Sequence, residues 1–458
     1  MKIRTNKFAE HFFSIVLLLY SVLAFFLPTI VTKAFVEWMF IAYVVFIGYN
    51  IYDNKRITLF QIWNISFVYV IISEMIKITH GDFVSEEYQY AIAFLLLANS
   101  IFIMGYEIVD FKVHKWIKVY DYKISHKKFF IMMLVMFALL YLYFKIGRAV
   151  SVSSQGRKVA GALGSGNVVN TFVNAIGLLT PSLIGYYFAC HTKNKWVSLL
   201  FVIPLFAVQF LISTRFRVLY MAMPYFILMG IIPLKIDKIR KILILGLLLV
   251  AFSVGSTYLK KYRYVSSIEE LDWSVLYTES SNRFVSIANK MSPEGVVRMT
   301  VLANDYFKTH PLSQGRETSY VTYFWVPRSV WKDKPIPIDY WLIREYEEIG
   351  ESVTTASGFT GEIRADFGNY CFIIVFLWGL CLKYLDVLVA SVDIKRKSFN
   401  NVLYAMLFPW IFFFVRSPST ATISFLLEVF LFLFVRRLFT KRDVFRYGKG
   451  LLGVRNKK

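Results

Sequence analysis

The stretch 371–392, CFIIVFLWGLCLKYLDVLVASV, decides the fold class of this chain. It is almost wholly apolar and has the roughly 20-residue length that crosses the hydrocarbon core of a bilayer. In lipid the backbone must satisfy its own hydrogen bonds, and a single segment of this length does so as an α-helix. The stretch therefore predicts a transmembrane helix.

Similar apolar runs recur along the chain and together predict about twelve transmembrane helices. The composition agrees: 57% of the 458 residues are hydrophobic and only 18% are charged, too few charged residues for a soluble chain of this size. We therefore expect an all-α polytopic membrane protein with a large, partly helical extracytoplasmic loop. The other predicted spans are 11–31, 35–52, 59–79, 88–109, 129–147, 169–190, 196–213, 218–234, 242–260, 401–415 and 420–437.

The basic residues predict the orientation. If the N-terminus lies inside and the spans alternate, most Lys- and Arg-rich connections fall on the cytoplasmic side, as the positive-inside rule requires. Both termini are then cytoplasmic, in a bacterial inner (plasma) membrane. The net charge of +22 thus indicates membrane topology and not a nucleic-acid partner.

The orientation divides the chain into four parts: transmembrane helices 1–9 in residues 1–260, an extracytoplasmic loop domain at 261–370, transmembrane helices 10–12 in 371–437, and a basic cytoplasmic tail at 438–458. A loop as long as 261–370 is usually functional.

Parts of this loop should be helical. Ser267 with Glu270 predicts a capping box, and Ser292-Pro293 predicts an N-cap followed by proline at the first helical position of a helix that ends before Pro311. His310 at that end is expected to cap. The stretch 320–341, rich in aromatic residues and prolines, should be extended or irregular.

The three cysteines, Cys190, Cys371 and Cys381, lie in or beside apolar segments without CxxC spacing. They predict neither a disulfide framework nor a metal site, and we expect no cofactor.

Arginines at the outer ends of spans are the first candidates for binding substrate. Arg215 and Arg217 belong to the sequence STRFR, and Arg416 to RSPST. Contact with lipid headgroups or a loop carboxylate is the ordinary role of such a residue. A cluster of them can instead grip a phosphate or pyrophosphate through forked hydrogen bonds.

The loop segment VPRSVWKDKP, residues 326–335, adds three cations: Arg328, Lys332 and Lys334. The ordinary interpretation is a solvated charge run on a structural turn. The functional interpretation is a rigid cationic lip, braced by prolines, beside an aromatic platform suited to a phosphorylated sugar.

The segment SGFTGEIRADFG, residues 357–368, supplies two candidate catalytic carboxylates. If it is helical, Glu362 and Asp366 share one face while Arg364, a further candidate for binding substrate, points elsewhere. A carboxylate at the membrane surface can act as a general base. The alternative is that it caps the helix or pairs with a loop arginine.

Charged residues also occur within the predicted spans. Glu74 with Lys77, and Lys383 with Asp386, are three residues apart and can neutralise each other on one helix face. Glu428 has no such local partner and is therefore the one of interest.

These motifs give the chain a resemblance to the bacterial Wzy-type polymerases, which join the oligosaccharide repeat units of O-antigen, part of lipopolysaccharide, and of capsule. The resemblance covers most of the chain: the many helices, the late outer loop, the TRFR turn, VPRSVWKDKP, GEIRADFG, and an arginine before the last helix. The sequence RSP at 416–418 departs from the arginine followed by small and acidic residues that the resemblance leads us to expect.

The resemblance implies a glycosyltransferase at the outer face of the membrane. Its donor would be a glycan on undecaprenyl pyrophosphate, and its acceptor a repeat unit on the same lipid. Arginines would stabilise the leaving pyrophosphate, and a carboxylate, Glu362 before Asp366, would take the proton of the acceptor hydroxyl. Membrane lipids are implied partners, and the resemblance leaves room for a chain-length regulator.

Two other functions share this architecture. An O-antigen ligase uses the same lipid donor but is expected to carry a functional histidine in its loop. A flippase or transporter of lipid-linked oligosaccharides has a similar number of spans, but usually repeated halves and short loops. A scaffold or receptor would leave the arginines at three outer sites unexplained.

Overall fold

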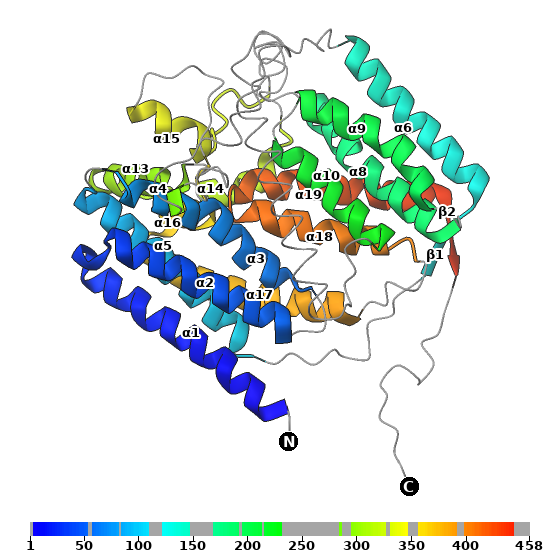
Figure 1. The fold of residues 1–458 in the computed structure, drawn as a ribbon. Helices are drawn as coiled ribbons and strands as arrows, with labels where there is room; N and C mark the ends of the chain where they lie inside the picture. Colours follow the sequence, from blue (N-terminus) through cyan, green and yellow to red (C-terminus); the bar gives the residue numbers. More distant parts are fainter. Residues whose placement is uncertain are drawn as a thin grey trace, which may run out of the picture.

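The computed structural model is a helical bundle with one small sheet (Figure 1). Its description covers residues 3–53, 57–81, 84–109, 121–146, 168–191, 195–212, 215–230, 284–285, 295–326, 330–346, 356–391 and 398–443. The predicted span 242–260 and the predicted capping box at Ser267 lie outside these residues.

The predicted apolar runs that fall within the described residues are helical. Their ends agree within a few residues except at the first run, predicted as 11–31, where the helix is Ile3–Phe26. These helices are α1 (Ile3–Phe26), α2 (Lys33–Asp53), α3 (Leu59–Phe67), α4 (Ser73–Thr79), α5 (Glu86–Glu107), α6 (His126–Ile146), α8 (Val168–His191), α9 (Leu199–Ile212), α10 (Arg215–Met229), α17 (Cys371–Ser391), α18 (Asn401–Phe414) and α19 (Pro418–Phe439). A π-helical turn, η2 (Val68–Ile72), joins α3 to α4.

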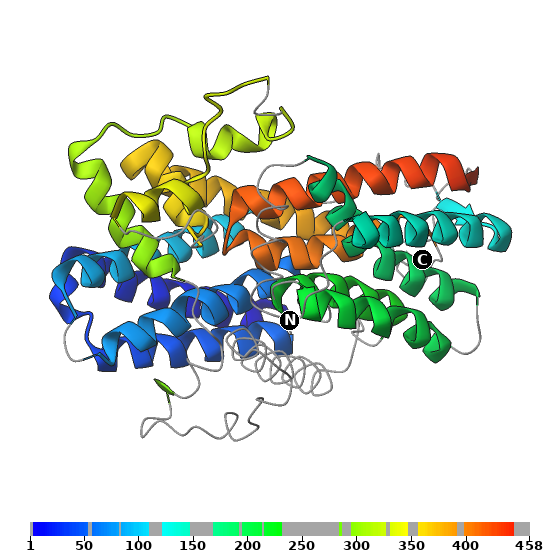
Figure 2. The same cartoon turned by 90° about the horizontal axis from the view of Figure 1, so that it is seen from above.

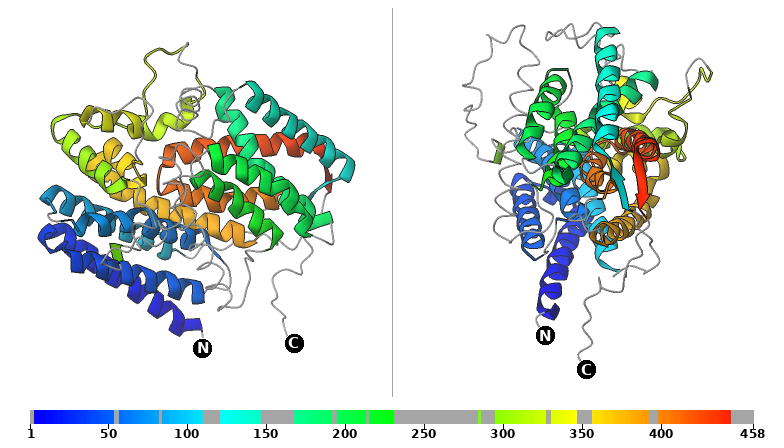
Figure 3. Two further views of the ribbon diagram at one scale, coloured as in Figure 1. Left: turned by 45° about the horizontal axis from the view of Figure 1, so that its top comes forward. Right: turned by 90° about the vertical axis from the view of Figure 1, so that its right-hand side faces the viewer.

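Within the described residues, five helical segments are long and apolar enough to cross a membrane: Lys33–Tyr52, Leu59–Thr79, Glu86–Glu107, Phe359–Val389 and Pro418–Phe439. Shorter apolar helices accompany them, and α1 and α6 lie at opposite edges of the bundle (Figures 1 and 3). The structure thus has the helices of a membrane protein.

The helix ends gather at two ends of the bundle. Four shorter helices, α13 (Val296–Thr309), α14 (Arg316–Tyr323), α15 (Ile338–Tyr346) and α16 (Phe359–Phe367), lie at what we call the loop end (Figure 2). There α13 meets α4 and α5, and α14 meets α19. At the opposite tail end, β1 (Asp121–Ile124) pairs antiparallel with β2 (Thr440–Asp443).

The described loop helices do not stand apart from the bundle. Val296, Val297 and Ile363 belong to the main core, while Met299, Leu342 and Ala365 form a second, smaller core with their neighbours. The helix predicted to end before Pro311 ends at Thr309, and His310 is its C-cap residue, as expected.

Two local predictions for the loop were wrong. α13 begins after Gly295, its N-cap residue, which has φ +86°, a conformation that glycine adopts readily. Ser292 and Pro293, where the helix was predicted to begin, lie outside the described residues. The stretch 320–341 is irregular only in its middle, since α14 and α15 reach into it from both sides. Its prolines separate two short helices and do not prevent them.

Two glycines let α5 and α17 approach closely. A Cβ atom at Gly379 would lie 2.3 Å from the carbonyl oxygen of Phe102, and one at Gly105 would lie 2.2 Å from that of Phe376. Small residues allow this backbone contact between helices that are not driven together by the hydrophobic effect in lipid. The pair fixes α17 and hence the start of α16.

We predict that Gly379→Val lowers the stability of the purified protein by at least about 2 kcal/mol, because the new side chain collides with backbone that cannot move away. Gly48→Val is the matched control, since nothing lies within 4 Å of a Cβ at that position. Thermal unfolding in detergent measures both. Equal unfolding temperatures for the two variants would contradict the close packing of α5 and α17.

Candidate functional site

Three stretches that are distant in sequence meet at the loop end: 316–319, 357–366 and 416–419. The backbone N–H of Gly358 donates to the carbonyl oxygen of Arg416 (2.8 Å), and that of Phe359 donates to the carbonyl of Val415 (3.1 Å). The first N–H groups of α16 therefore satisfy carbonyls at the end of α18, which would otherwise lack partners.

This junction is buried against the bundle. Phe359, in the first turn of α16, packs against Trp63 of α3 (5.5 Å between ring centroids) and Trp378 of α17 (5.9 Å). Ala356, Ser357 and Glu362 are at most 2% exposed. The start of α16 is therefore enclosed by helices of the bundle.

The non-helical backbone that precedes α16 is buried in protein. Gly358 makes the turn into α16 with φ +71°, and a Cβ there would lie 2.5 Å from Cγ1 of Val296. A small cavity beside the turn is lined in part by Asn99, Thr360 and Val415. The junction is thus a built polar site within an apolar bundle.

Glu362 lies at the centre of this junction. Its side chain accepts hydrogen bonds from the hydroxyl of Ser357 (3.0 Å, Oε1) and from that of Ser419 (2.6 Å, Oε2). Only 2% of Glu362 is exposed. Glu362, the predicted general base, is therefore buried behind two serine hydroxyls and does not lie on an open surface.

Asp339, at the start of α15, completes the junction from the loop side. Its Oδ1 accepts from the backbone N–H of Ser357 (2.7 Å) and its Oδ2 from the hydroxyl of Ser417 (2.7 Å). Burial raises the pKa of Asp339, while these hydrogen bonds and the positive charge of Arg416 act in the opposite direction. Asp339 and Glu362 thus form a pair of buried carboxyl groups that share Ser357.

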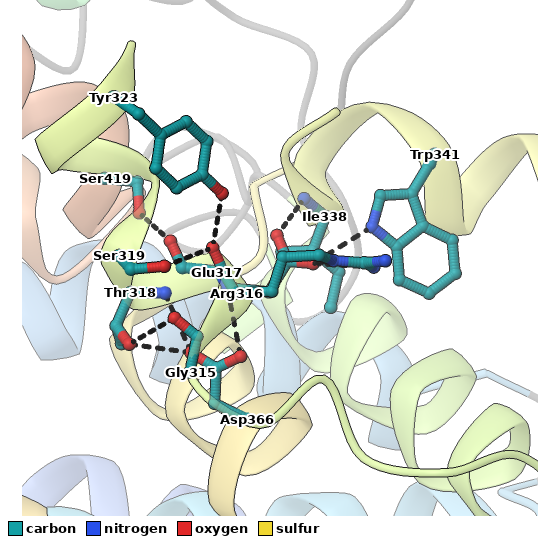
Figure 4. A network of polar contacts seen from close by, with 10 residues as sticks. All are labelled: Gly315, Arg316, Glu317, Thr318, Ser319, Tyr323, Ile338, Trp341, Asp366 and Ser419. Atoms are coloured by element: carbon teal, nitrogen blue, oxygen red, sulfur yellow. Dashed lines mark hydrogen bonds and ion pairs between the residues drawn. The ribbon is translucent and has the colours of Figure 1, made fainter. Parts of the chain in front are cut away.

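Asp366, the second predicted catalytic carboxylate, is placed differently. It accepts from the backbone N–H groups of Glu317 (3.0 Å) and Thr318 (2.7 Å) and from the Thr318 hydroxyl (2.8 Å) (Figure 4). These groups form the first turn of α14. Asp366 therefore caps that helix from another segment, and its geometry favours a structural role.

Glu317 continues the same chain of contacts. It accepts from the backbone N–H of Ile338 (2.8 Å), which opens α15, and from Nε1 of Trp341 (3.3 Å), and it pairs with Arg316 (Figure 4). Burial raises the pKa of Glu317, and the charge of Arg316 opposes this. Asp366 thus holds α14, and Glu317 of α14 holds α15, which carries Asp339.

We predict that Asp366→Ala destabilises the protein by about 2 kcal/mol, because α14 loses the carboxylate that caps its first turn. Limited proteolysis should then cut the 310–340 region at lower protease concentration. Glu345→Ala, a change at an exposed carboxylate on α15, serves as the control. Unchanged proteolysis in Asp366→Ala would show that α14 does not depend on this cap.

The predicted cations fall into four groups. Arg416 is half-buried in the junction itself, with its charge acting on Asp339. Lys332 is exposed on the loop. Arg328 and the side chains of Arg215 and Arg217 lie outside the described residues, although the backbone of Arg215 begins α10. The two arginines of STRFR therefore occupy the first turn of a helix.

α10 and α18 nevertheless lie side by side at the loop end. Tyr220 of α10 contacts Phe413 of α18, with 5.2 Å between ring centroids. Arg215 precedes Tyr220 by little more than one turn, and Arg416 closely follows Phe413. The backbone therefore brings the STRFR and RSPST segments, predicted from separate parts of the sequence, to the same region.

The remaining two predicted cations have local partners. Lys334 is buried and donates from Nζ to the carbonyl oxygens of Phe324 (2.5 Å) and Val326 (3.1 Å), which closes the loop between α14 and α15. Arg364 donates to the side-chain oxygens of Asn304 and Asn369. Both arrangements favour holding the loop over binding substrate.

Sequence reasoning missed Asp339, Glu317 and the three serines. Nothing in the spacing around Asp339 marks it, because its partners Ser357 and Ser417 are 18 and 78 residues away. Ser417 and Ser419 lie inside the RSPST motif, from which only Arg416 was predicted to bind substrate.

The in-span carboxylates have partners that the sequence did not indicate. Asp386 accepts from the N–H groups of Leu59 (2.6 Å) and Phe60 (3.0 Å) at the start of α3. Glu74 accepts from the N–H of Arg298 at the start of α13 (3.2 Å). Glu428 is buried on α19 and, among the described residues, its Oε1 has no hydrogen-bond partner.

Comparison of this chain with protein-family models, with curated proteins and with solved structures found no match.

Proposed function

We propose that this protein is a membrane glycosyltransferase that polymerises oligosaccharide repeat units carried on undecaprenyl pyrophosphate, at the outer face of the bacterial inner membrane. In this proposal about twelve helices cross the membrane, both termini are cytoplasmic, and the loop end faces outward. The products would be O-antigen or capsular polysaccharide.

One observation carries the proposal: the start of GEIRADFG and the RSPST turn, which the resemblance singled out separately, meet in one buried polar junction. The N–H of Gly358 binds the carbonyl of Arg416, and Ser419 binds Glu362. A lipid-linked substrate needs a polar site that opens at the depth of its headgroup, beside apolar helices that can accept its tail.

The arginines supply the electrostatic part of the reaction. Attack by an acceptor hydroxyl on the anomeric carbon expels lipid pyrophosphate, so negative charge develops on the leaving group. Arg416, together with Arg215 and Arg217 at the neighbouring start of α10, would stabilise this charge. No nucleotide sugar takes part, because breaking the bond between the anomeric carbon and the lipid-linked pyrophosphate drives the transfer.

Glu362 is the carboxylate that we propose as general base. Its oxygens are held by two serine hydroxyls, whereas those of Asp366 are committed to the first turn of α14. A carboxylate oxygen accepts more than one hydrogen bond, so Glu362 can bind a further hydroxyl. The acceptor would reach it beside Ser357 or Ser419.

The test is complementation in a host from which the gene has been deleted, with the surface glycan examined on a gel. We predict that the wild-type gene restores the polymer ladder. Glu362→Gln and Arg416→Lys should leave single repeat units attached, because the first loses the base and the second loses the forked donor geometry. Arg437→Lys, exposed at the tail end, should behave as wild type.

The same gel separates the alternatives. Loss of all attached glycan on deletion would indicate a ligase, and accumulation of lipid-linked units on the cytoplasmic side would indicate a flippase. A normal ladder in Glu362→Gln at normal protein level would remove Glu362 as the base.

A further inference from the structure

We propose that Asp339 of α15 is a positioning residue for Arg416, and that it sets the guanidinium to receive the diphosphate of a lipid-linked substrate. The inference rests on the proposed function, and it assigns to the outer loop a direct part in building the anion site.

The contacts of Asp339 lie on both sides of Arg416. Oδ2 accepts from the hydroxyl of Ser417, the next residue along the chain (2.7 Å). Oδ1 accepts from the N–H of Ser357 (2.7 Å), and the following residue, Gly358, donates to the carbonyl of Arg416 (2.8 Å). One carboxylate therefore fixes the backbone of Arg416 from two directions.

Burial makes this arrangement rigid. Asp339 is 5% exposed, Ser417 5% and Ser357 1%. Hydrogen bonds that cannot be exchanged for water are costly to break. The backbone at position 416 is consequently held in one geometry although it lies in a turn between two helices.

Charge adds a second link. The positive charge of Arg416 acts on Asp339, the buried carboxyl group that holds its turn. A long arginine side chain loses rotamer freedom when it binds a ligand, and a neighbouring anion that pre-orients it removes part of that cost. A diphosphate would then meet a guanidinium whose backbone is already fixed and whose charge already faces a carboxyl partner.

The other buried carboxylates provide a contrast. Glu74 accepts from the N–H of Arg298 at the start of α13, a helix that does not belong to the 415–419 turn. Glu74→Gln should therefore affect the docking of α13 without changing the affinity for a diphosphate. It is the matched control for Asp339→Asn.

The experiment measures the dissociation constant of farnesyl diphosphate, a short isoprenyl diphosphate, for the purified full chain in detergent. We expect Asp339→Asn and Ser417→Ala each to weaken binding about tenfold, as the loss of one hydrogen bond to a charged group would. Ser417→Thr, which keeps the hydroxyl, should retain the wild-type affinity, and so should Glu74→Gln.

A double-mutant cycle separates positioning from general stability. If Asp339 acts through Arg416, Asp339→Asn should have little further effect on binding in an Arg416→Gln background. A full additional loss in that background, or wild-type affinity in Asp339→Asn alone, would overturn the inference. Failure of the wild-type protein to bind the diphosphate would instead overturn the proposed diphosphate clamp, and the positioning role with it.

Discussion

The structure depends on buried carboxylates that bind the first N–H groups of helices contributed by other segments. Asp386 of α17 holds α3, Glu74 of α4 holds α13, Asp366 of α16 holds α14, and Glu317 of α14 holds α15. A helix start carries unsatisfied donors and partial positive charge. In apolar surroundings no water competes for them, so each carboxylate fixes a helix that hydrophobic packing alone would leave free to slide.

These contacts form a series that ends at the candidate site. The bundle holds α16, α16 holds α14 through Asp366, and α14 holds α15 through Glu317. Glu362 differs from the helix-capping carboxylates because its two hydrogen bonds come from the hydroxyls of Ser357 and Ser419, whereas Asp366 accepts from the first backbone N–H groups of α14. Asp339 binds the hydroxyl of Ser417 and the N–H of Ser357, outside the first turn of a helix. A carboxylate whose oxygens bind the first N–H groups of a helix has a structural role. Asp339 and Glu362 at the junction are the pair that remains for a role in the proposed reaction. This distinction separates Glu362 from Asp366, the second candidate base of the sequence analysis.

The helices could be predicted from the sequence because hydrophobicity and length are local properties. The face shared by Glu362 and Asp366 also followed from local spacing, and α16 is helical where that spacing required it. The partners of the buried charges could not be predicted in this way. Lys383 was the expected partner of Asp386, yet Asp386 accepts from residues more than 300 positions away, and local spacing carries no information about such a contact.

The prolines around 335 also concealed part of the candidate site from sequence-based prediction. They predicted an irregular segment, and so hid α15 and with it Asp339. Proline interrupts a helix without preventing one from starting soon afterwards. The motifs themselves, GEIRADFG and RSPST, were found separately, and only the fold brings them together.

The account requires the loop end and the tail end to lie on opposite sides of the membrane, with the loop end outside. The direct measurement places single cysteines at Lys332 and Arg437, in a chain whose three native cysteines are replaced by serine, and treats intact spheroplasts with a membrane-impermeant maleimide. The account predicts that position 332 is labelled at once and position 437 only after permeabilisation. Labelling of position 332 only from the cell interior would contradict it.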